Sequence, residues 1–340
     1  MERAKVLLRA LRRFRSIRKP WIFVCASFCT PAAAYSQNVR TVGVDVENDY
    51  FDFWRAPERR SDDNYTQGFH VSSSLGNLPG WAARNVHPCG SPFTFPRNSP
   101  SETCAEGKLS IGQELYTPTN DAPQPILGER PYAALLFVDL TREAVSARVL
   151  SGLTVRLGVT GPPALGKETQ EWFHRQVSGF REPLGWDHQI RSQAIFFLRY
   201  DYRRAAIDRR GRLRLVLAPK GELILGNLAT SASAGIDGTL GYNSPHPWDS
   251  DIEPRPFFRI YLTSGAQAEW IGYSLILRGN TPETSGLVQM RHLVPQWYAG
   301  VYVGLSRLTL GFKSISRGLE YQTGPSRHTW GQIALTYEFF

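Results

Sequence analysis

Strict alternation of apolar residues with small or polar ones is the feature that most limits the folds open to this chain. Every second residue is apolar from Trp297 to Leu305, and the alternation resumes from Leu308 to Phe312 after a break near Ser306. Successive side chains of a β-strand point to opposite faces, so a two-residue period predicts strands with one apolar face. Residues 333–340 repeat the pattern at the end of the chain. We therefore expect an all-β protein.

Further strands are predicted along the rest of the chain, where β-branched and aromatic residues gather between loops. They cover Thr41–Val46, Tyr65–Leu75, Leu109–Tyr116 and Ala133–Leu140. A long irregular loop is expected over Gly76–Lys108, and a proline-rich connection over Thr117–Arg130.

The N-terminal segment has the composition of a secretory signal peptide. Residues 1–19 carry eight basic side chains and one acidic one, an apolar run follows from Trp21 to Phe28, and an Ala-x-Ala site ends at Ala34. We therefore predict a signal peptide over residues 1–34 and a barrel domain over residues 35–340. The full chain has a net charge of +9, and without residues 1–34 it is only +2. The small net charge that remains gives no argument for nucleic-acid binding.

Alternating strands that follow a signal peptide are typical of outer-membrane β-barrels. Inside a bilayer every backbone polar group needs a partner, so the strands of a spanning sheet must close on themselves. The aromatic terminal strand agrees, although Phe340 lies off the apolar register of Ile333, Leu335, Tyr337 and Phe339. A secreted, soluble β-barrel or sandwich is the alternative, because alternation alone fits that class too.

Two cysteines remain once the predicted signal peptide is removed. Cys89 and Cys104 lie in a loop rich in proline, serine and glycine. In an oxidising compartment a local disulfide is expected. It would stabilise the fold by roughly 3 kcal/mol on the chain-entropy model. Two thiolates alone do not complete a metal site, so metal binding is the weaker hypothesis.

One segment departs from the strand pattern. A strand ends near Val159 and meets Gly161-Pro162-Pro163, which interrupts a β-ladder because proline has no N–H. Residues Lys167–Val177 then predict a short helix, on which Gln170 and His174 are four apart and share one face. We interpret it as a loop helix that carries an active-site histidine. The alternative is a surface crossover whose histidine is merely exposed.

Polar residues also recur at the ends of other predicted strands, in the segments Glu47–Asp49, Asn64–Gly68, Gly112–Pro118 and Glu129–Ala133. The chain has no Gly-x-Ser-x-Gly elbow, no phosphate-binding loop and no His-Glu-x-x-His zinc helix. Its candidate site is therefore built from several separated segments.

These segments together resemble the outer-membrane lipid A 3′-O-deacylases over nearly the whole mature chain. Each motif is short, and their order and spacing carry the resemblance. The matching motifs are Asn48-Asp49, Tyr65-Thr66-x-Gly68, Gly112-Gln113 with Tyr116-Thr117-Pro118, Arg130-Pro131-Tyr132-Ala133, Gly158 with Gly161-Pro162, Gln170-x-x-x-His174, and Gly185-Trp186-x-x-Gln189.

The resemblance implies a transmembrane antiparallel β-barrel of about 12 strands, with a short helix in a loop that carries the active-site histidine. It also implies calcium-dependent hydrolysis of the 3′-linked acyloxyacyl ester of lipid A in the outer leaflet. The family's catalytic residues fall here on Asn48, Asp49, Thr66, Gln170 and His174. Its glutamate falls on Glu182, although Phe180 and a spacing to Trp186 that is one residue longer depart from the pattern.

The residue types suit ester hydrolysis. His174 is the side chain in these motifs whose ordinary pKa lies near neutrality, which suits a base that activates water. Asp49 and Glu182 offer the hard oxygen ligands that Ca²⁺ prefers, and the ion would stabilise the oxyanion. Gln170 would orient the base or the substrate, and Thr66 and Asn48 would donate hydrogen bonds.

The expected partners are therefore lipopolysaccharide as substrate and the outer membrane as surroundings, with the chain acting as a monomer. Two alternatives stay open. An outer-membrane phospholipase would use a serine nucleophile, and no serine lies in the matched motifs. A non-catalytic barrel, such as a channel or an adhesin, would keep the strands and have no need of His174.

Overall fold

The computed structural model describes most of the chain after the predicted signal peptide. The described residues are 39–52, 64–75, 103–120, 122–145, 148–176, 183–244 and 256–339, without the side chains of residues 40, 75, 103–106, 145 and 176. No helix in these ranges is long and apolar enough to cross a membrane.

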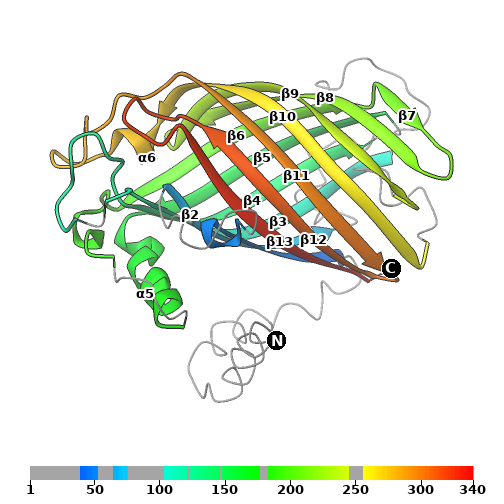
Figure 1. The fold of residues 1–340 in the computed structure, drawn as a ribbon, viewed down its shortest axis with the longest axis horizontal. Helices are drawn as coiled ribbons and strands as arrows, with labels where there is room; N and C mark the ends of the chain where they lie inside the picture. The colour runs from blue at the N-terminus through cyan, green and yellow to red at the C-terminus, as the bar shows by residue number, and fades with distance from the viewer. Residues whose placement is uncertain are drawn as a thin grey trace. The chain divides into compact units, whose positions relative to one another are not determined.

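Twelve antiparallel strands close into a barrel, which confirms the predicted fold class (Figure 1). Strands adjacent in sequence pair with each other, β1 pairs with β13, and the pairing of β6 with β8 closes the ring. A short β7 (Ile207–Arg209) continues along β8 where β6 ends. The other strands are β1 (Val39–Asn48), β2 (Asn64–Leu75), β3 (Thr103–Thr117), β4 (Ala133–Val145), β5 (Val149–Thr160), β6 (Gln193–Arg204), β8 (Arg214–Gly226), β9 (Ala229–Tyr242), β10 (Phe258–Ser274), β11 (Leu293–Leu305), β12 (Leu308–Gly318) and β13 (Arg327–Glu338).

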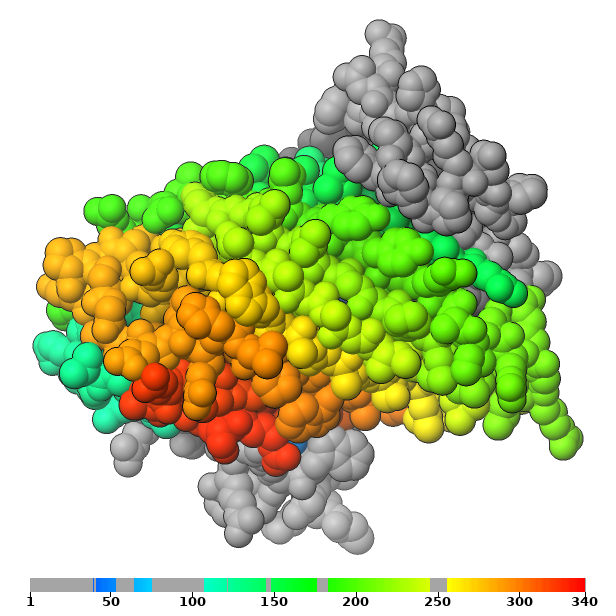
Figure 2. Space-filling view, turned by 90° about the horizontal axis from the view of Figure 1, so that it is seen from above, coloured from blue at the N-terminus to red at the C-terminus, as the bar shows by residue number. Residues whose placement is uncertain are grey.

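The two faces of the barrel wall have opposite polarity. Large apolar side chains stand half-exposed on the outer face, among them Leu140, Leu157, Leu198, Leu225 and Leu262. Figure 2 shows the wall from β8 to β11 as a continuous outer surface, coloured from green to orange. Water would disfavour such a surface and lipid would not, so the arrangement is that of a membrane barrel. The alternative of a soluble barrel or sandwich is therefore wrong.

Charged side chains fill the lumen. Arg156 donates from Nε and Nη2 to the two carboxylate oxygens of Asp139, at 2.8 Å each, and its Nη1 lies 3.2 Å from Glu114 Oε1. The same guanidinium lies 3.4 Å from the centroid of the Phe137 ring. Buried charges are costly unless they are paired, and here the pairing joins the neighbouring strands β3, β4 and β5 along the inner face of the wall.

One loop boundary differs from the prediction. Residues 103–108 were expected in the irregular loop, but they form the first part of β3. They do so because β4 extends to Val145 and offers a partner as far as Thr103. Cys89 and the side chain of Cys104 lie outside the described residues, as does Phe340. The disulfide therefore stays a prediction.

All the described helices lie at one end of the barrel, which we call the helical rim. They are η2 (Asp49–Phe51), η4 (Pro162–Ala164), α5 (Gly166–Gln176), η5 (Trp186–His188) and α6 (Leu275–Arg278). Figure 1 shows α5 and α6 at the same end, opposite the C-terminus. The predicted break and helix are both confirmed, because β5 stops at Thr160, Gly161 takes a φ of +82°, and α5 follows the two prolines.

Candidate active site

Part of the outer wall at the helical rim is covered by protein. Leu115 on β3 and Ala134 on β4 face each other in the ladder and are fully buried. Yet Ile111, on the same outward face of β3, is 49% exposed. The covered pair forms a small apolar core with Tyr132, Ala164 and Trp186. η4, the start of α5 and η5 therefore lie against the outside of the barrel, where a spanning strand would otherwise meet lipid.

Close contacts fix η4 and the start of α5 to the wall. Gln113, which also faces outward from β3, donates from Nε2 to the carbonyl oxygen of Ala164 at 2.6 Å. A Cβ at Gly166 would lie 2.5 Å from the Cβ of Ala134 and 2.6 Å from the Trp186 ring, so only glycine permits this approach. The start of α5 is thus held directly on β4.

The inner face of α5 carries the predicted pair of polar residues. Gln170 and His174 are buried, at 2% and 7% exposure, whereas Trp172 on another face is 43% exposed. Trp186 Nε1 donates to Gln170 Oε1 at 2.7 Å. The shared helix face is confirmed, and the alternative of an exposed crossover histidine is wrong.

Asn48 and Asp49 sit where the chain leaves β1 and folds over the outer wall. The Asn48 side chain caps η2, because its Oδ1 accepts a hydrogen bond from the backbone N–H of Tyr50 at 2.8 Å. Asp49 is 1% exposed. Gly331 pairs with Asn48, and a Cβ there would lie 2.6 Å from both the Cβ and the carbonyl oxygen of Phe51. This glycine therefore lets η2 lie on β13.

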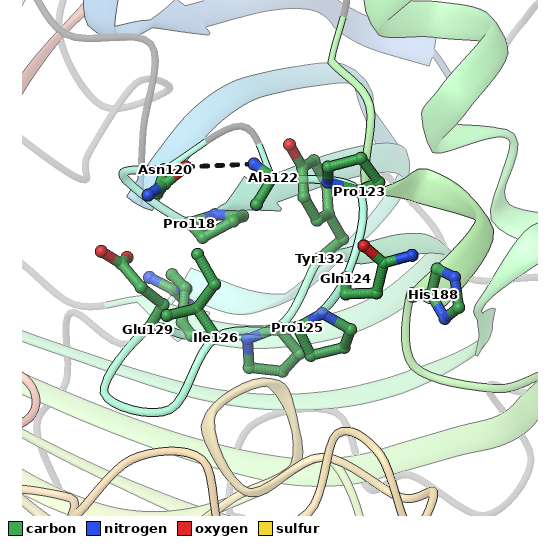
Figure 3. Close-up of a pocket in the computed structure, with 13 residues that line it drawn as sticks. Pro118, Asn120, Ala122, Pro123, Gln124, Pro125, Ile126, Glu129, Tyr132 and His188 are labelled. Atoms are coloured by element: carbon green, nitrogen blue, oxygen red, sulfur yellow. Dashed lines mark hydrogen bonds between the residues drawn. The ribbon is translucent and has the colours of Figure 1, made fainter.

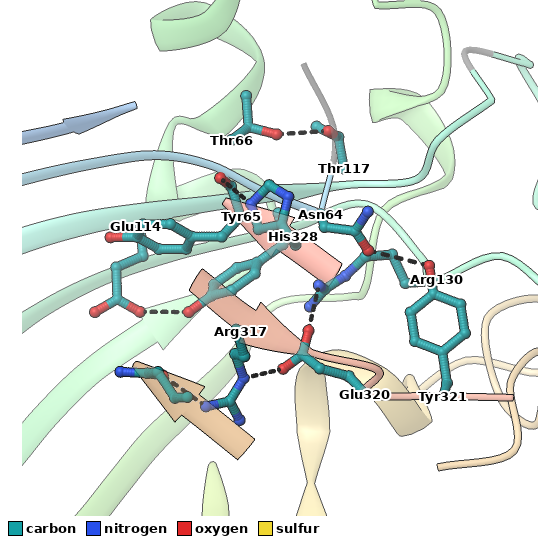
Figure 4. A network of polar contacts seen from close by, with 12 residues as sticks. Asn64, Tyr65, Thr66, Glu114, Thr117, Arg130, Arg317, Glu320, Tyr321 and His328 are labelled. Carbon is teal, nitrogen blue, oxygen red and sulfur yellow. Dashed lines mark hydrogen bonds and ion pairs between the residues drawn. The ribbon is translucent and has the colours of Figure 1, made fainter. Parts of the chain in front are cut away.

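Thr66 reaches the outer side of the wall through a β-bulge. The register of β2 against β3 shifts between Tyr65 and Gln67, which leaves Thr66 as the extra residue. Its hydroxyl lies 2.6 Å from that of Thr117, and both side chains are buried. In Figure 4 these two threonines lie on one side of the sheet, and Tyr65 and Glu114 lie on the other.

A network of ion pairs on the lumen side supports the rim (Figure 4). Arg130 is fully buried and its Nη1 lies 3.2 Å from Glu320 Oε2, while Arg317 binds Glu320 and Glu269 at 2.8 Å each. Burial alone would raise the pKa of Glu320, but the guanidinium groups of Arg317 and Arg130 more than offset this and hold it below its usual range. The network fixes the chain just before Tyr132, whose ring lies 5.1 Å from that of Trp186.

One exposed ion pair joins α5 to η5. Lys167 Nζ lies 2.8 Å from Asp187 Oδ1. This hydrogen bond, with the attraction of the opposite charge, raises the pKa of Lys167 and lowers that of Asp187. Because both groups are exposed to water, the pair adds little stability and mainly restrains η5 relative to α5.

The proline-rich loop before β4 encloses a small cavity at the same rim (Figure 3). The loop is stiffened by its prolines and by a hydrogen bond of 3.2 Å from the backbone N–H of Ala122 to Asn120 Oδ1. Tyr132, Gly185 and His188 complete the lining. The cavity volume is about 10 Å³, which is room for one water molecule and not for a lipid group.

The structure thus places five of the six predicted site residues, all buried, at the helical rim on or against the outer wall: Asn48, Asp49, Thr66, Gln170 and His174. Glu182 lies outside the described residues. Among the residues that are described, no three His, Cys, Asp or Glu side chains gather into a metal site.

Roles for Gln113, Thr117 and Trp186 were missed in the sequence. They anchor η4, hold Thr66 and fix Gln170, respectively. The sequence contains a pattern that could have indicated the roles of Gln113 and Thr117. Both are polar residues at outward positions of a strand whose preceding outward residues, Leu109 and Ile111, are apolar and exposed.

We expect Gly331→Ala to lower activity while the barrel still forms. The added methyl group would collide with Phe51 and push η2, with Asp49, away from the wall. A displacement of about 1 Å in a catalytic group can cost roughly 10²-fold in rate. Gly221→Ala is the matched control, since the only atom near its Cβ is the Ser233 carbonyl oxygen at 3.6 Å. Comparison of initial rates on lipid A tests this, and equal rates for the two variants would show that η2 tolerates the shift.

The fold and this site together define an outer-membrane β-barrel with a covered polar site on its outer wall. The family described as "Outer membrane protein LpxR" matches residues 21–339. The chain therefore belongs to the LpxR family, outer-membrane lipid A 3′-O-deacylases that are ester hydrolases.

The likeness to one solved structure supports the fold. LpxR from Salmonella typhimurium superposes with a TM-score of 0.71 at 17% identity, over 88% of this chain and 100% of that one. An outer-membrane channel from Pseudomonas putida F1 gives a TM-score of 0.39 at 12% identity, over 89% of this chain and 96% of that one. No curated protein sequence matches the chain.

Proposed function

We propose that this chain hydrolyses the 3′-linked acyloxyacyl ester of lipid A in the outer leaflet. One observation carries the proposal: polar side chains are buried on the outer side of the wall beneath α5, at a rim of the barrel. A lipid in the leaflet can approach such a site from the side, with its ester level with the rim. A site inside the lumen would be closed to it by the charged side chains there.

The geometry supports His174 as the base. It lies on the buried face of α5, one helical turn from Gln170, and would take a proton from the water that attacks the ester carbonyl. The amide oxygens of Gln170 and Asn48 are both occupied, by Trp186 Nε1 and by the backbone N–H of Tyr50. These bonds orient both amides, and the NH₂ group of Asn48 would donate to a substrate oxygen.

The donor set at the site also fits a calcium ion. Apart from His174, its candidate residues offer only carboxylate, amide and hydroxyl oxygens, which are hard ligands of the kind Ca²⁺ prefers. Asp49 and Glu182 would hold the ion. Bound calcium would supply positive charge near the carbonyl oxygen of the ester.

We further propose that residues 1–34 are removed as a signal peptide, and that the helical rim faces the exterior while the protein acts as a monomer. The orientation is supported by the opposite end of the barrel, where Ser306 and Arg307 alone link β11 to β12. Outer-membrane barrels commonly have short turns on the periplasmic side and longer loops outside.

Mass spectrometry of lipid A tests the proposed function. We expect cells that produce this chain, in a strain with no deacylase of this kind, to lose the 3′-linked acyloxyacyl group from lipid A. A phospholipase would instead form lysophospholipid, and a channel or adhesin would leave both lipid classes intact. Unchanged lipid A in cells with folded barrel in the outer membrane would reject the proposal.

A further inference from the structure

A groove of about 500 Å³ lies on the outer wall of β10–β13. Asp52, just after η2, lines one part of it. Because η2 lies against β13 and β2 whereas α5 lies against β4, the groove is on the other side of η2 from α5. It therefore adjoins the candidate active site without including any of its predicted residues.

Large apolar side chains line the groove and small ones form its floor. Leu262, Trp297 and Val301 are 56%, 42% and 37% exposed on the outer face, and Phe312 faces Val301 across the ladder. Between them Ala299 pairs with Ser314. Because these two side chains are small, the wall is hollowed where a lipid-facing strand usually carries bulky residues.

The polar groups of the groove gather at its rim end. The hydroxyl groups of Ser316 and Thr329 lie 2.7 Å apart and satisfy each other, so they need no partner from a ligand. The charged lining residues are Asp52 and Arg327, and Arg327 is exposed at the start of β13. The lining thus changes from apolar within the wall to charged at the rim.

That change matches an amphiphile with an anionic head, because Arg327 is exposed whereas the carboxylate residue Asp52 is buried. From Ser316 to Phe312 the groove follows five residues of β12, roughly 14 Å of strand, which accommodates a long stretch of hydrocarbon. Arg327 would face the head group of the same molecule. A lipid that bridges η2 would then have its ester at the site beneath α5 and another chain in the groove.

We propose that the groove binds an acyl chain of the lipid A molecule whose 3′ ester is cleaved, and that this chain is not itself hydrolysed. The inference rests on the proposed function. Burial of each CH₂ group strengthens binding, and binding energy from a remote part of a substrate helps to hold the reacting ester in place. The groove is therefore a specificity determinant for multiply acylated lipids.

Binding to variants with a filled groove tests the proposal. Ala299→Trp places a large ring over the groove floor. Ala234→Trp makes the same change at an exposed outward position of β9, away from the groove. Both are made in a His174→Gln background so that lipid A stays intact. Retained lipid is measured by native mass spectrometry of the purified barrel in detergent, with lipid A or a phospholipid of equal chain length.

We expect Ala299→Trp to weaken lipid A binding about 10-fold or more, since several CH₂ contacts are lost, and Ala234→Trp to bind as the parent does. Equal lipid A binding by the two variants would overturn the proposal. It would also fail if the phospholipid bound as tightly and lost as much affinity on Ala299→Trp, because the groove would then hold any membrane lipid.

Heat-modifiable migration on a gel shows whether each variant folds. If Ala299→Trp does not fold, the same comparison is made with Ala299→Leu, and Ala234→Leu is then the control. Because no hydrolysis is needed, the binding contrast can be read even if the chain does not cleave lipid A. Failure of the groove and failure of the proposed function are therefore separate results.

Discussion

His174→Gln is expected to leave a folded barrel that hydrolyses lipid A about 10²–10⁴-fold more slowly than the parent protein. Glutamine keeps a polar group of similar reach on the buried face of α5 but cannot accept a proton at neutral pH. The variant therefore removes basicity with little change in packing. A time course of released acyl chains, followed by mass spectrometry, measures the rate.

The fold should survive this change because α5 takes no part in closing the barrel. The ring is closed by strand pairing alone, and α5 lies against its outer wall. His188→Gln is the matched control. His188 is also at the helical rim, where its Nδ1 lies 3.0 Å from Glu283 Oε2, and this exposed contact lies outside the proposed chemistry. If His174→Gln retained the parent rate while His188→Gln lost activity, the assignment of the base would be wrong.

The barrel wall could be predicted from the sequence because its signal is local. Each strand shows its two faces by alternation, as from Leu293 to Leu305, and a tight turn such as the one at Ser306 sets the register of the next strand. The start of β3 could not be predicted this way. Residues 103–108 lack an alternating pattern and are in a strand because β4 is long enough to pair with them.

The candidate site was predicted only in part, because its geometry depends on contacts between distant segments. The sequence placed Gln170 and His174 on one helix face, since four-residue spacing is a local property. It did not show that this face meets the outer wall. That follows from Gln113 binding Ala164, and from Ala134 lying close enough to α5 that position 166 must be glycine.

The positions of η2 and of the Gln170 amide also depend on residues that are distant in the sequence. Asn48 and Asp49 were recognised as polar residues at a strand end, but their placement depends on Gly331, far along the chain. Trp186, sixteen residues after Gln170 in the sequence, fixes the orientation of its amide. Neither relation leaves a periodic pattern that sequence alone would show.

Asp49→Asn is expected to reduce hydrolysis at limiting Ca²⁺ to the level of the parent protein in excess chelator. Asparagine has nearly the same shape, so the buried end of β1 and the cap of η2 by Asn48 should persist. It lacks the negative charge that makes a carboxylate a strong ligand for a hard cation. Loss of a Lewis acid costs several kcal/mol of transition-state stabilisation, so the rate should fall by roughly 10²-fold or more.

A titration with Ca²⁺ shows whether the Asp49 carboxylate binds the ion or only stabilises the fold. If Asp49 binds the ion, the Asp49→Asn variant should regain part of its activity at high Ca²⁺, because its half-saturation point has moved upward. Asp187→Asn is the control, since Asp187 is an exposed acid at the same rim that pairs with Lys167. Its half-saturation point should equal that of the parent. Full activity of the parent protein in excess chelator would remove calcium from the mechanism, and the amide and hydroxyl donors of Asn48 and Thr66 would then have to stabilise the oxyanion alone.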